Sequence, residues 1–375
     1  MTKSKILFIA NTAWSMYNFR KNLLQRLIKD GYKVEIICPF EENFMGKLTK
    51  LGCVCHQITM SAKGVNPFKN LKLVYDLYRL IKHIAPDFIF CYTIKPNIFG
   101  SIAAGIAKIP SIAITTGLGY TFLHKNLVSR ISGFLYKFAL IFPREVWFLN
   151  NDDLQTFRAL NLVSAEKAKI LRGEGIDLQR FNISSLEQPD NVIRFLAIAR
   201  MLWDKGINEF ILAAQEIKKK FDNVEFQLLG FVGTSNPQAI PMEQIKSWAE
   251  QGIAHYLGAT GNVIPFIQKA SCIVLPSYYR EGIPISLLEG AAMGKPIITS
   301  NTAGCKDTVT DGITGYLCEP RDVDSLVSAM KKIILLDKSE RLKMGLMGRK
   351  KMEKEYDVQI VIEHYLTTLE RNLGS

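Results

Sequence analysis

Residues 272–289 read CIVLPSYYREGIPISLLE, and the class of fold can be inferred from their order. Its apolar start, Cys272 to Pro276, predicts a buried parallel strand. A loop containing glycine follows, and Pro284 suits the first position of a helix. Strand, loop and helix in this order are typical of an open α/β sheet, where ligands bind at the carboxyl ends of the strands. We therefore expect a ligand in the loop after this strand.

Two carboxylates, Glu281 in the loop and Glu289 about one turn into the helix, can face the same crevice. The N–H groups at a helix start attract an anion such as a diphosphate. Carboxylates beside a phosphate are repulsive unless they bind hydroxyl groups, so the pattern favours a sugar nucleotide. A solvated loop glutamate and a helix-surface glutamate are the structural alternative, and this stretch alone leaves both interpretations open.

A pair of cations upstream favours the binding interpretation. The segment Phe195 to Ala199 predicts a strand, and Arg200 and Lys205 follow it before a helix expected over 207–219. A planar guanidinium fork and a compact ammonium at a strand end can together neutralise a diphosphate leaving group. Two ordinary surface cations in a basic chain are the alternative, but their position at a strand end makes it weaker.

The order of these residues resembles the donor half of the family 4 glycosyltransferases, which are retaining enzymes of the GT-B fold. The matching positions are Arg200 and Lys205, then Gly230, then the glutamates at 281 and 289. The amino-terminal half is similar to the bacterial branch that builds capsule, O-antigen and lipid-linked oligosaccharides. It matches at AWSMYNFR (13–20), YTIKPN (92–97) and TGLGYTF (116–122), so the resemblance covers essentially the whole chain.

This resemblance implies a donor site for a UDP-sugar, expected to carry an N-acetylhexosamine. Arg200 and Lys205 would stabilise the diphosphate, Glu289 would bind ribose hydroxyls, and Glu281 would bind sugar hydroxyls and organise the reaction. The expected catalytic residues are Arg200, Lys205 and Glu281, and the expected nucleotide-sugar-binding residues add Gly230, Gly282, Ile283, Pro284, Ile285 and Glu289. Backbone N–H groups of residues 282–285 would complete the site.

The acceptor is expected to enter from the amino-terminal half. The expected acceptor-binding residues are Lys95, Asn97, Gly117 and Gly119. Many relatives carry a histidine in this wall, but residues 93–95 contain none, so we assign no role to His124 or His255.

Neither a metal nor a cofactor is expected. Asp322 and Asp324 form a DxD pattern, and Asp152 and Asp153 form a second acidic pair, but each pair precedes a predicted helix. Aspartates there cap free N–H groups and favour the helix dipole. The chain has no GxGxxG or GxxxxGK[ST] run, so a nicotinamide or ATP site lacks its phosphate loop.

At 375 residues the chain is long enough for two ordinary domains. The expected strands are 5–10, 33–38, 87–92, 111–115, 145–149, 195–199, 224–229, 254–257, 271–275 and 296–299. The expected helices are 18–30, 68–84, 97–107, 126–141, 207–219, 242–251, 284–293 and 323–335. This alternation predicts an α/β protein with two doubly wound parallel sheets. We expect an acceptor domain over 1–182, a donor domain over 190–352, and a carboxyl-terminal helix over 353–375 that returns to the first domain, the last by resemblance.

The positive charge is concentrated in the first half. Residues 1–180 carry 25 Lys and Arg against 12 Asp and Glu, whereas residues 181–375 carry 22 against 23. A basic domain favours an anionic partner such as nucleic acid, anionic lipid or a diphosphate-bearing acceptor. The stretches 71–81 and 122–142 mix bulky apolar residues with cations and are either amphipathic helices docked on the sheet or segments at a membrane interface.

Taken with the resemblance, the charge favours an anionic inner-membrane surface and a polyprenyl-diphosphate-linked acceptor. Nucleic acid is not expected, because no recognition motif accompanies the cations. The seven cysteines form no CxxC pair and are expected to be reduced. The apolar run near the first residue is shorter than a signal peptide needs, so we expect a cytoplasmic protein that is peripheral on the inner membrane.

Two other classes of function remain open. The same scaffold supports other enzymes of sugar nucleotides, such as a 2-epimerase or a hydrolase. A non-catalytic basic module that binds a membrane or a nucleic acid would also explain the charge. Only an enzyme predicts a large rate loss when Glu281 or Lys205 is replaced by alanine.

Overall fold

The computed structural model describes residues 4–60, 66–118, 127–183, 191–233 and 236–374. The chain forms two compact units, one built from Met1–Gly175 with Val358–Ser375 and the other from Ile176–Asp357. We call them unit 1 and unit 2. The division falls before the expected end at residue 182, and the chain re-enters unit 1 at Val358 rather than at residue 353.

Unit 1 contains a seven-stranded sheet in the order β3-β2-β1-β4-β5-β6-β7, with every neighbouring pair parallel. Its strands are β1 (Lys5–Ile9), β2 (Lys33–Cys38), β3 (Val54–Gln57), β4 (Phe88–Tyr92), β5 (Ser111–Thr115), β6 (Glu145–Phe148) and β7 (Ala168–Ile170). The central strands are fully buried apolar runs, as expected where helices cover both faces.

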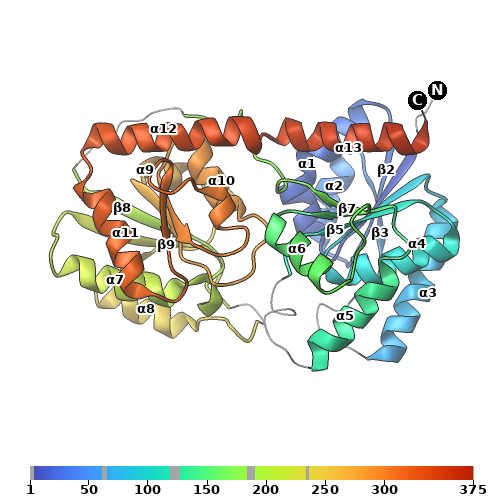
Figure 1. Cartoon of the computed structure of the whole chain (residues 1–375), viewed down its shortest axis with the longest axis horizontal. Coiled ribbons are helices and arrows are strands. Elements are labelled where there is room, and N and C mark those ends of the chain that lie inside the picture. Colours follow the sequence, from blue (N-terminus) through green and yellow to red (C-terminus); the bar gives the residue numbers. More distant parts are fainter. Residues whose placement is uncertain (1–3, 61–65, 119–126, 184–190, 234–235, 375) are drawn as a thin grey trace. The chain divides into compact units, whose positions relative to one another are not determined.

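Helices cover both faces of this sheet (Figure 1). One layer holds α1 (Ala13–Lys29), α2 (Glu42–Lys50) and α13 (Val358–Leu373). The other holds α3 (Pro67–Ile84), the π-helix η1 (Pro96–Gly100), α4 (Ser101–Ala107) and α5 (Leu127–Ala139), and α6 (Asn151–Ala159) links β6 to β7. The return of the carboxyl-terminal helix gives unit 1 a buried Tyr365, whose ring centroid lies 5.0 Å from those of Phe90 and Trp147.

Unit 2 contains a six-stranded parallel sheet in the order β10-β9-β8-β11-β12-β13. Its strands are β8 (Ile193–Ile198), β9 (Val224–Leu229), β10 (His255–Tyr256), β11 (Cys272–Leu275), β12 (Ile297–Ser300) and β13 (Gly315–Cys318). One face carries α7 (Ile207–Lys218), α8 (Met242–Glu250) and α11 (Val323–Leu335), and the other carries α9 (Ile264–Lys269), α10 (Ile285–Ala292) and α12 (Lys338–Glu355) (Figure 1). The predicted pair of doubly wound sheets is confirmed.

The elements that the sequence did not predict lack the expected apolar pattern. The strands β3 and β7 have no fully buried residue, and β13 is only four residues long. The long helix α12 has no apolar stripe, because it docks on α10 through small residues. A side chain at Gly345 would lie 1.8 Å from the carbonyl oxygen of Gly294, so only glycine permits this approach.

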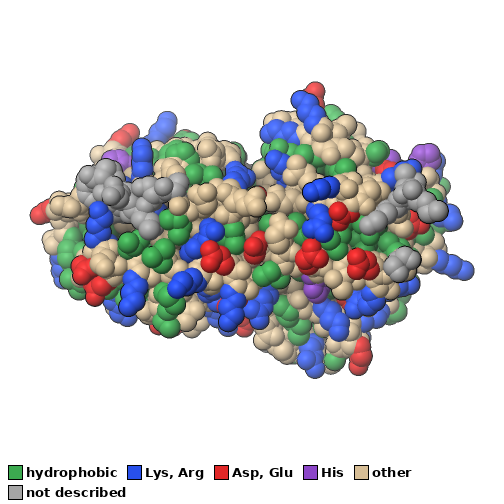
Figure 2. Space-filling view, turned by 90° about the horizontal axis from the view of Figure 1, so that it is seen from above, with side chains coloured by type: hydrophobic (Ala, Val, Ile, Leu, Met, Phe, Trp, Pro, Cys, Tyr) green, Lys and Arg blue, Asp and Glu red, His purple; other side chains and the backbone are tan. Residues whose placement is uncertain are grey.

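Figure 2 shows one face of the molecule, on which basic and acidic side chains are interspersed. Helix α12 carries ion pairs one helical turn apart, Arg349 with Glu353 at 2.7 Å and Lys351 with Glu355 at 3.2 Å. Such pairs stabilise an exposed helix modestly. Among the described residues, no helix combines the length and apolarity needed to cross a membrane.

Candidate active site

The loop after β8 brings a cation to the carboxyl end of the unit 2 sheet. A short 3-10 helix, η3 (Trp203–Lys205), is followed by Gly206, which has a φ of 73° and precedes α7. A Cβ atom at this position would lie 2.0 Å from the carbonyl oxygen of Pro276. Glycine therefore allows the loop after β8 to lie directly against the loop after β11.

Backbone hydrogen bonds join these two loops. The N–H groups of Tyr278 and Tyr279 each donate to the carbonyl oxygen of Asp204, both at 3.1 Å. The Ser277 hydroxyl oxygen also lies 3.3 Å from this carbonyl oxygen. The loop that carries Glu281 is thus fixed to the loop that carries Lys205.

Lys205 and Glu281 form a largely buried ion pair. The Lys205 ammonium donates to Oε1 of Glu281, and the Ser277 hydroxyl donates to the same oxygen at 3.0 Å. The Lys205 Nζ atom also lies 4.8 Å from the ring centroid of Tyr279. The side chains of the pair remain 11% and 13% exposed, so a ligand can reach them.

Asp204 is a second carboxylate beside this ion pair, and it was not among the expected site residues. Its side chain is buried, and its Oδ1 atom has no hydrogen-bond partner. Burial raises the pKa of the Asp204 carboxyl, Glu281 raises it further, and Lys205 and Arg200 oppose the shift. Three of the expected residues, Arg200, Lys205 and Glu281, therefore act electrostatically on one buried group, with Arg200 exposed to solvent.

Glu289 lies on α10 and has a different environment. Burial raises the pKa of its carboxyl to about 8, and the positive charge of Arg180 opposes this shift. Arg180 is a second residue that the sequence analysis missed. Pro284 is the N-cap of α10 rather than its first helical residue, and a proline has no N–H group. The expected backbone donors at 282–285 therefore exclude Pro284.

Gly230 follows β9 with a φ of 152°. A Cβ atom there would lie 1.7 Å from the carbonyl oxygen of Ala199, so the ends of β8 and β9 come together only at a glycine. The Gly230 carbonyl accepts a hydrogen bond of 2.8 Å from the Tyr256 hydroxyl. Gly230 therefore lies at the strand ends, where it contributes backbone atoms to the candidate site.

Three of the expected acceptor residues, Lys95, Asn97 and Gly117, follow β4 or β5 in unit 1. Thr93, directly after β4, has a φ of 74°, which is rare for a β-branched residue and typical of strained functional sites. Lys95 is partly buried, and burial lowers its pKa. Gly117 follows β5 with a φ of 110°, whereas Gly119 lies outside the described residues.

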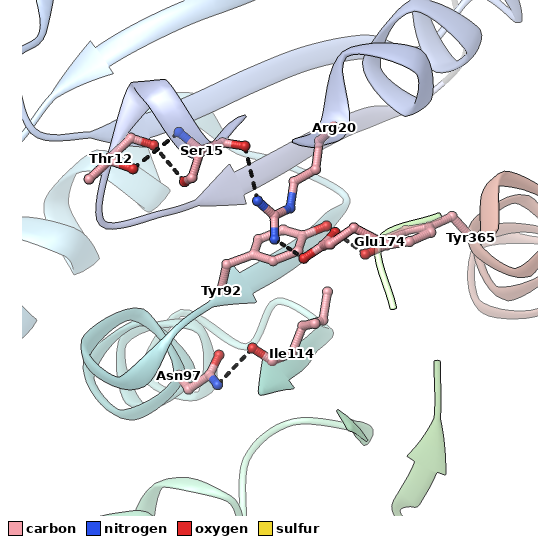
Figure 3. A network of polar contacts seen from close by, with 8 residues as sticks. All are labelled: Thr12, Ser15, Arg20, Tyr92, Asn97, Ile114, Glu174 and Tyr365. Carbon is pink, nitrogen blue, oxygen red and sulfur yellow. Dashed lines mark hydrogen bonds and ion pairs between the residues drawn. The ribbon is translucent and has the colours of Figure 1, made fainter. Parts of the chain in front are cut away.

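Asn97 has a structural position rather than an accessible one. It is fully buried in the π-helix η1, and its amide Nδ2 donates to the carbonyl oxygen of Ile114 at 3.0 Å (Figure 3). This bond ties the start of η1 to β5. In this structure Asn97 therefore holds the neighbouring backbone, and its expected contact with the acceptor stays a prediction.

A second buried ion pair lies in unit 1, between Arg20 of α1 and Glu174 (Figure 3). The Arg20 guanidinium also donates to the Ser15 carbonyl at 3.1 Å and lies 3.9 Å from the ring centroid of Tyr92. The Tyr92 and Tyr365 hydroxyls are 2.6 Å apart. Arg20 belongs to the motif at 13–20, and this network joins that motif to β4 and α13.

The DxD pattern serves as a helix cap. Asp322 accepts a hydrogen bond of 2.9 Å from the N–H of Ser325, and Asp324 lies in the first turn of α11. In the other acidic pair, both aspartates lie inside the first turn of α6, whose N-cap is Asn150. No group of three or more potential metal ligands occurs among the described residues.

Two family models match the chain. The one described as Glycosyl transferase 4-like matches residues 5–150, and the one described as Glycosyl transferases group 1 matches residues 179–351. A relative from Campylobacter jejuni, N,N'-diacetylbacillosaminyl-diphospho-undecaprenol alpha-1,3-N-acetylgalactosaminyltransferase, is 31% identical over 98% of this chain and 98% of its own length. The chain belongs to the glycosyltransferase family that these two models and this relative represent. The predicted resemblance to family 4 glycosyltransferases is thereby confirmed.

More distant relatives are also glycosyltransferases by name. The capsular polysaccharide biosynthesis glycosyltransferase CapM of Staphylococcus aureus is 26% identical over 86% of this chain and 87% of its own. The UDP-Gal:alpha-D-GlcNAc-diphosphoundecaprenol alpha-1,3-galactosyltransferase of Escherichia coli is 26% identical over 72% of each chain. This glycosyltransferase is therefore similar to enzymes of capsule and lipid-linked saccharide assembly.

Solved structures of glycosyltransferases share the fold. A glycosyltransferase from Rickettsia africae ESF-5 superposes with a TM-score of 0.82 at 18% identity, covering 100% of both chains. Anabaena Alr3699/HepE in complex with UDP-glucose gives a TM-score of 0.81 at 17% identity, covering 98% of this chain and 100% of its own. At these identities the likeness concerns the fold alone, and the expected GT-B fold is confirmed.

Proposed function

We propose that this glycosyltransferase transfers an N-acetylhexosamine from a UDP-sugar to a saccharide linked to a polyprenyl diphosphate, with retention of anomeric configuration. The observation that carries the proposal is the cluster of Arg200, Lys205 and Glu281 around buried Asp204 at the strand ends of unit 2. The Campylobacter and Escherichia relatives support the acceptor class, since the names of both enzymes specify a diphospho-undecaprenol substrate.

In the proposed donor complex, the diphosphate binds near Arg200 and Lys205. The bond between the sugar C1 atom and the diphosphate oxygen breaks, and the negative charge that develops on UDP is stabilised by these two cations. The acceptor oxygen bonds to C1, and its proton passes to the leaving phosphate. Preorganised cations in a partly dehydrated site make a metal ion unnecessary for this charge.

The carboxylates position the donor. Ser277 and Lys205 hold the Glu281 carboxylate in a fixed orientation, in which it accepts hydrogen bonds from sugar hydroxyls when the donor binds. Glu289 binds the ribose hydroxyls, and Arg180 supports its ionised form. The backbone around Gly230 and at the start of α10 completes the proposed nucleotide-sugar site. No cofactor is required in this scheme.

The acceptor is proposed to bind unit 1 at the ends of β4 and β5. Lys95 supplies a cation for a diphosphate-bearing acceptor, and the strained Thr93 backbone sets the direction in which the chain leaves β4. Gly117 allows a close approach of the acceptor to the end of β5. Because such an acceptor is held in a membrane by its lipid, we place the enzyme at the cytoplasmic face of the inner membrane as a peripheral protein.

The proposal is tested first with donors. UDP-, GDP- and ADP-linked sugars are compared for their ability to raise the thermal unfolding temperature, and we expect a UDP-N-acetylhexosamine to give the largest increase. Stabilisation by a GDP- or ADP-sugar alone would contradict the donor assignment. The best donor is then incubated with a polyprenyl-diphosphate sugar, and a product enlarged by one sugar is sought by mass spectrometry.

The same experiment separates the other enzyme classes. An epimerase or a hydrolase consumes the donor without any acceptor, whereas a transferase needs the lipid-linked sugar for efficient turnover. Product formation that is unchanged when the acceptor is omitted would therefore reject the proposed transfer.

A further inference from the structure

The outer face of α3 carries large apolar side chains in contact with water. Phe68, Leu71 and Tyr75 are 83%, 70% and 59% exposed, and their i, i+3, i+7 spacing places them on one side of the helix. The opposite side is buried in the core of unit 1 through Leu73 and Leu77, among others. The exposed side chains are therefore not needed for packing α3 on the sheet.

The helix α5 repeats this arrangement. Ile131, Phe134 and Phe138 are 39%, 74% and 49% exposed and have the same spacing as the three residues of α3. On the buried side, Tyr136 and Ala139 belong to the same core as the inner side of α3. Both helices pack on η1, so both lie on the same face of the sheet.

Cations continue the apolar stripe of α3. Arg79 and Lys82 extend the same helical side beyond Tyr75, and both are exposed. Asp76 is the acidic residue of α3, and it lies 3.4 Å from Lys72 in an ion pair. Lys137 on α5 is exposed as well. The stripe thus combines aromatic and aliphatic side chains with an excess of positive charge.

We propose that this face of unit 1 docks on the surface of an anionic lipid bilayer. We call it the α3–α5 face and define it by Phe68, Leu71, Tyr75, Arg79, Lys82, Ile131, Phe134, Lys137 and Phe138. Helices that lie in a membrane interface present such a mixture, with aromatic side chains at the headgroup level and cations on the anionic surface. The partner is a bilayer because the net charge of the face is complementary to anionic headgroups.

This inference deepens the proposed function and rests on it for its purpose, which is to bring unit 1 to an acceptor held by a lipid. The docking itself requires neither donor nor acceptor. Its physical basis is the removal of exposed rings from water together with the attraction between Lys or Arg and anionic headgroups. Each contribution can therefore be measured separately.

The test is a sedimentation assay with the full chain and no substrate. Vesicles of phosphatidylcholine alone are compared with vesicles that also contain phosphatidylglycerol. We expect binding to the anionic vesicles, weaker binding to the neutral ones, and a decrease as salt is added. Equal binding to both kinds of vesicle, or binding to neither, would overturn the proposal.

Variants separate the apolar and charged contributions. We expect Phe68→Ser/Leu71→Ser/Tyr75→Ser to weaken binding to anionic vesicles by about a hundredfold or more. The change Arg79→Gln/Lys82→Gln should weaken it by about 25-fold at low salt, roughly fivefold for each cation.

Matched controls use exposed residues away from this face. Val54 and Ile360, also in unit 1, are 51% and 47% exposed, and Val54→Ser/Ile360→Ser should leave binding unchanged. For the cations, Lys343→Gln/Lys350→Gln changes two exposed lysines of α12. Loss of binding in these controls equal to that in the face variants would show that general hydrophobicity or net charge is responsible, and would overturn the proposal.

Two further measurements exclude a folding defect and a different partner. Thermal unfolding, and its shift with UDP, should be the same in the face variants and the unchanged protein. Light scattering at several protein concentrations tests for a second copy of the chain. A dimer that the apolar variant abolishes, with vesicle binding unaffected, would assign the face to self-association and overturn the proposal. Transfer to a detergent-solubilised acceptor tests the proposed function independently of docking.

Discussion

Arg20 and Glu174 form a buried ion pair in unit 1, and Lys205 and Glu281 form one in unit 2. The first pair is 3% and 7% exposed, and Arg20 is further held by a carbonyl group and an aromatic ring. The second pair is 11% and 13% exposed and adjoins the buried carboxylate of Asp204. Two ion pairs, each of a cation with a glutamate, therefore occupy two different kinds of environment.

Burial and surroundings distinguish an ion pair that stabilises the fold from one that can bind a ligand. The unit 1 pair is the more buried of the two and connects α1 to the end of the first segment of unit 1, so its loss affects the fold. The unit 2 pair lies in two loops at strand ends, and a neighbouring carboxylate oxygen has no hydrogen-bond partner in the protein. Five measurements test this comparison or sharpen it.

The largest expected effect is on the stability of unit 1. Arg20→Met leaves the Glu174 carboxylate buried without its partner, and we expect the free energy of unfolding to fall by about 3–5 kcal/mol. Urea unfolding followed by tryptophan fluorescence measures the change. Arg20→Met/Glu174→Leu removes both charges and should recover most of it. A loss below about 1 kcal/mol for the single change would remove the contrast between the two pairs.

The next effect is on catalysis in unit 2. Lys205→Ala should lower kcat by about 10²–10³-fold, because the developing charge on the diphosphate loses a cation. The Lys205→Ala change should lower the free energy of unfolding less than Arg20→Met does, since Glu281 keeps its bond to Ser277 and is partly exposed. Lys219→Ala, at an exposed lysine of the same unit, is the control. A kcat that stays within about twofold would exclude Lys205 from the reaction.

The third prediction concerns pH. Because the pKa of Glu289 is about 8 in the unliganded protein, the carboxyl is mostly protonated at neutral pH. If it binds ribose hydroxyls as a carboxylate, UDP affinity should rise up to about tenfold per pH unit as the pH approaches this value, and then level off. Calorimetry at several pH values between about 7 and 9 measures this. Glu289→Gln should give a flatter profile, and an unchanged profile would contradict the assignment.

The raised pKa of Glu289 also determines the direction in which the stability of the protein changes with pH. The pKa of Glu289 in the folded protein lies above the unfolded value of about 4.3. The contribution of Glu289 to the free energy of unfolding is therefore complete below about pH 4.3 and is lost as the pH rises to about 8. The unfolding temperature of Glu289→Gln is therefore compared with that of the unchanged protein at each pH. The difference in favour of the variant should be larger at pH 8 than at about pH 5.

The smallest expected effect is at Arg321. This residue has a φ of 62°, and its guanidinium lies 4.4 Å from the ring centroid of Tyr278, in the loop that leads to Glu281. Removing this contact in Arg321→Ala should cost about 0.5–1 kcal/mol, which corresponds to a roughly two- to fivefold decrease in kcat/KM. Asp324→Asn, on the same segment, serves as the control. Equal effects of the two changes would assign the loss to helix α11 instead.

The sequence predicted the site where strand order and residue type were sufficient. The apolar run before Pro276 identifies β11, and a strand end then places Glu281; the same argument places Lys205 after β8. The side of the loop on which each residue lies was not predictable. Asp204 adjoins Lys205 in sequence, but only the folded loop shows that its carboxyl is buried among charges.

Other features depended on contacts between distant segments. Arg180 acts on Glu289 although no local pattern connects them. Asn97 matched a motif, yet its burial follows from the π-helix that places its amide against β5. Short strands such as β3 carry no apolar run and form because β2 supplies a parallel partner. Local periodicity therefore predicts the layers but not the contacts that assign roles within them.

Unit 1 is assembled from both ends of the chain, and this has a consequence for its biosynthesis. Unit 2 is contiguous in sequence, so its sheet can form soon after Asp357 leaves the ribosome. The rings of Phe90 and Trp147 receive their partner Tyr365 only when the last helix emerges. The basic half of the protein, although translated first, is therefore the half that matures last.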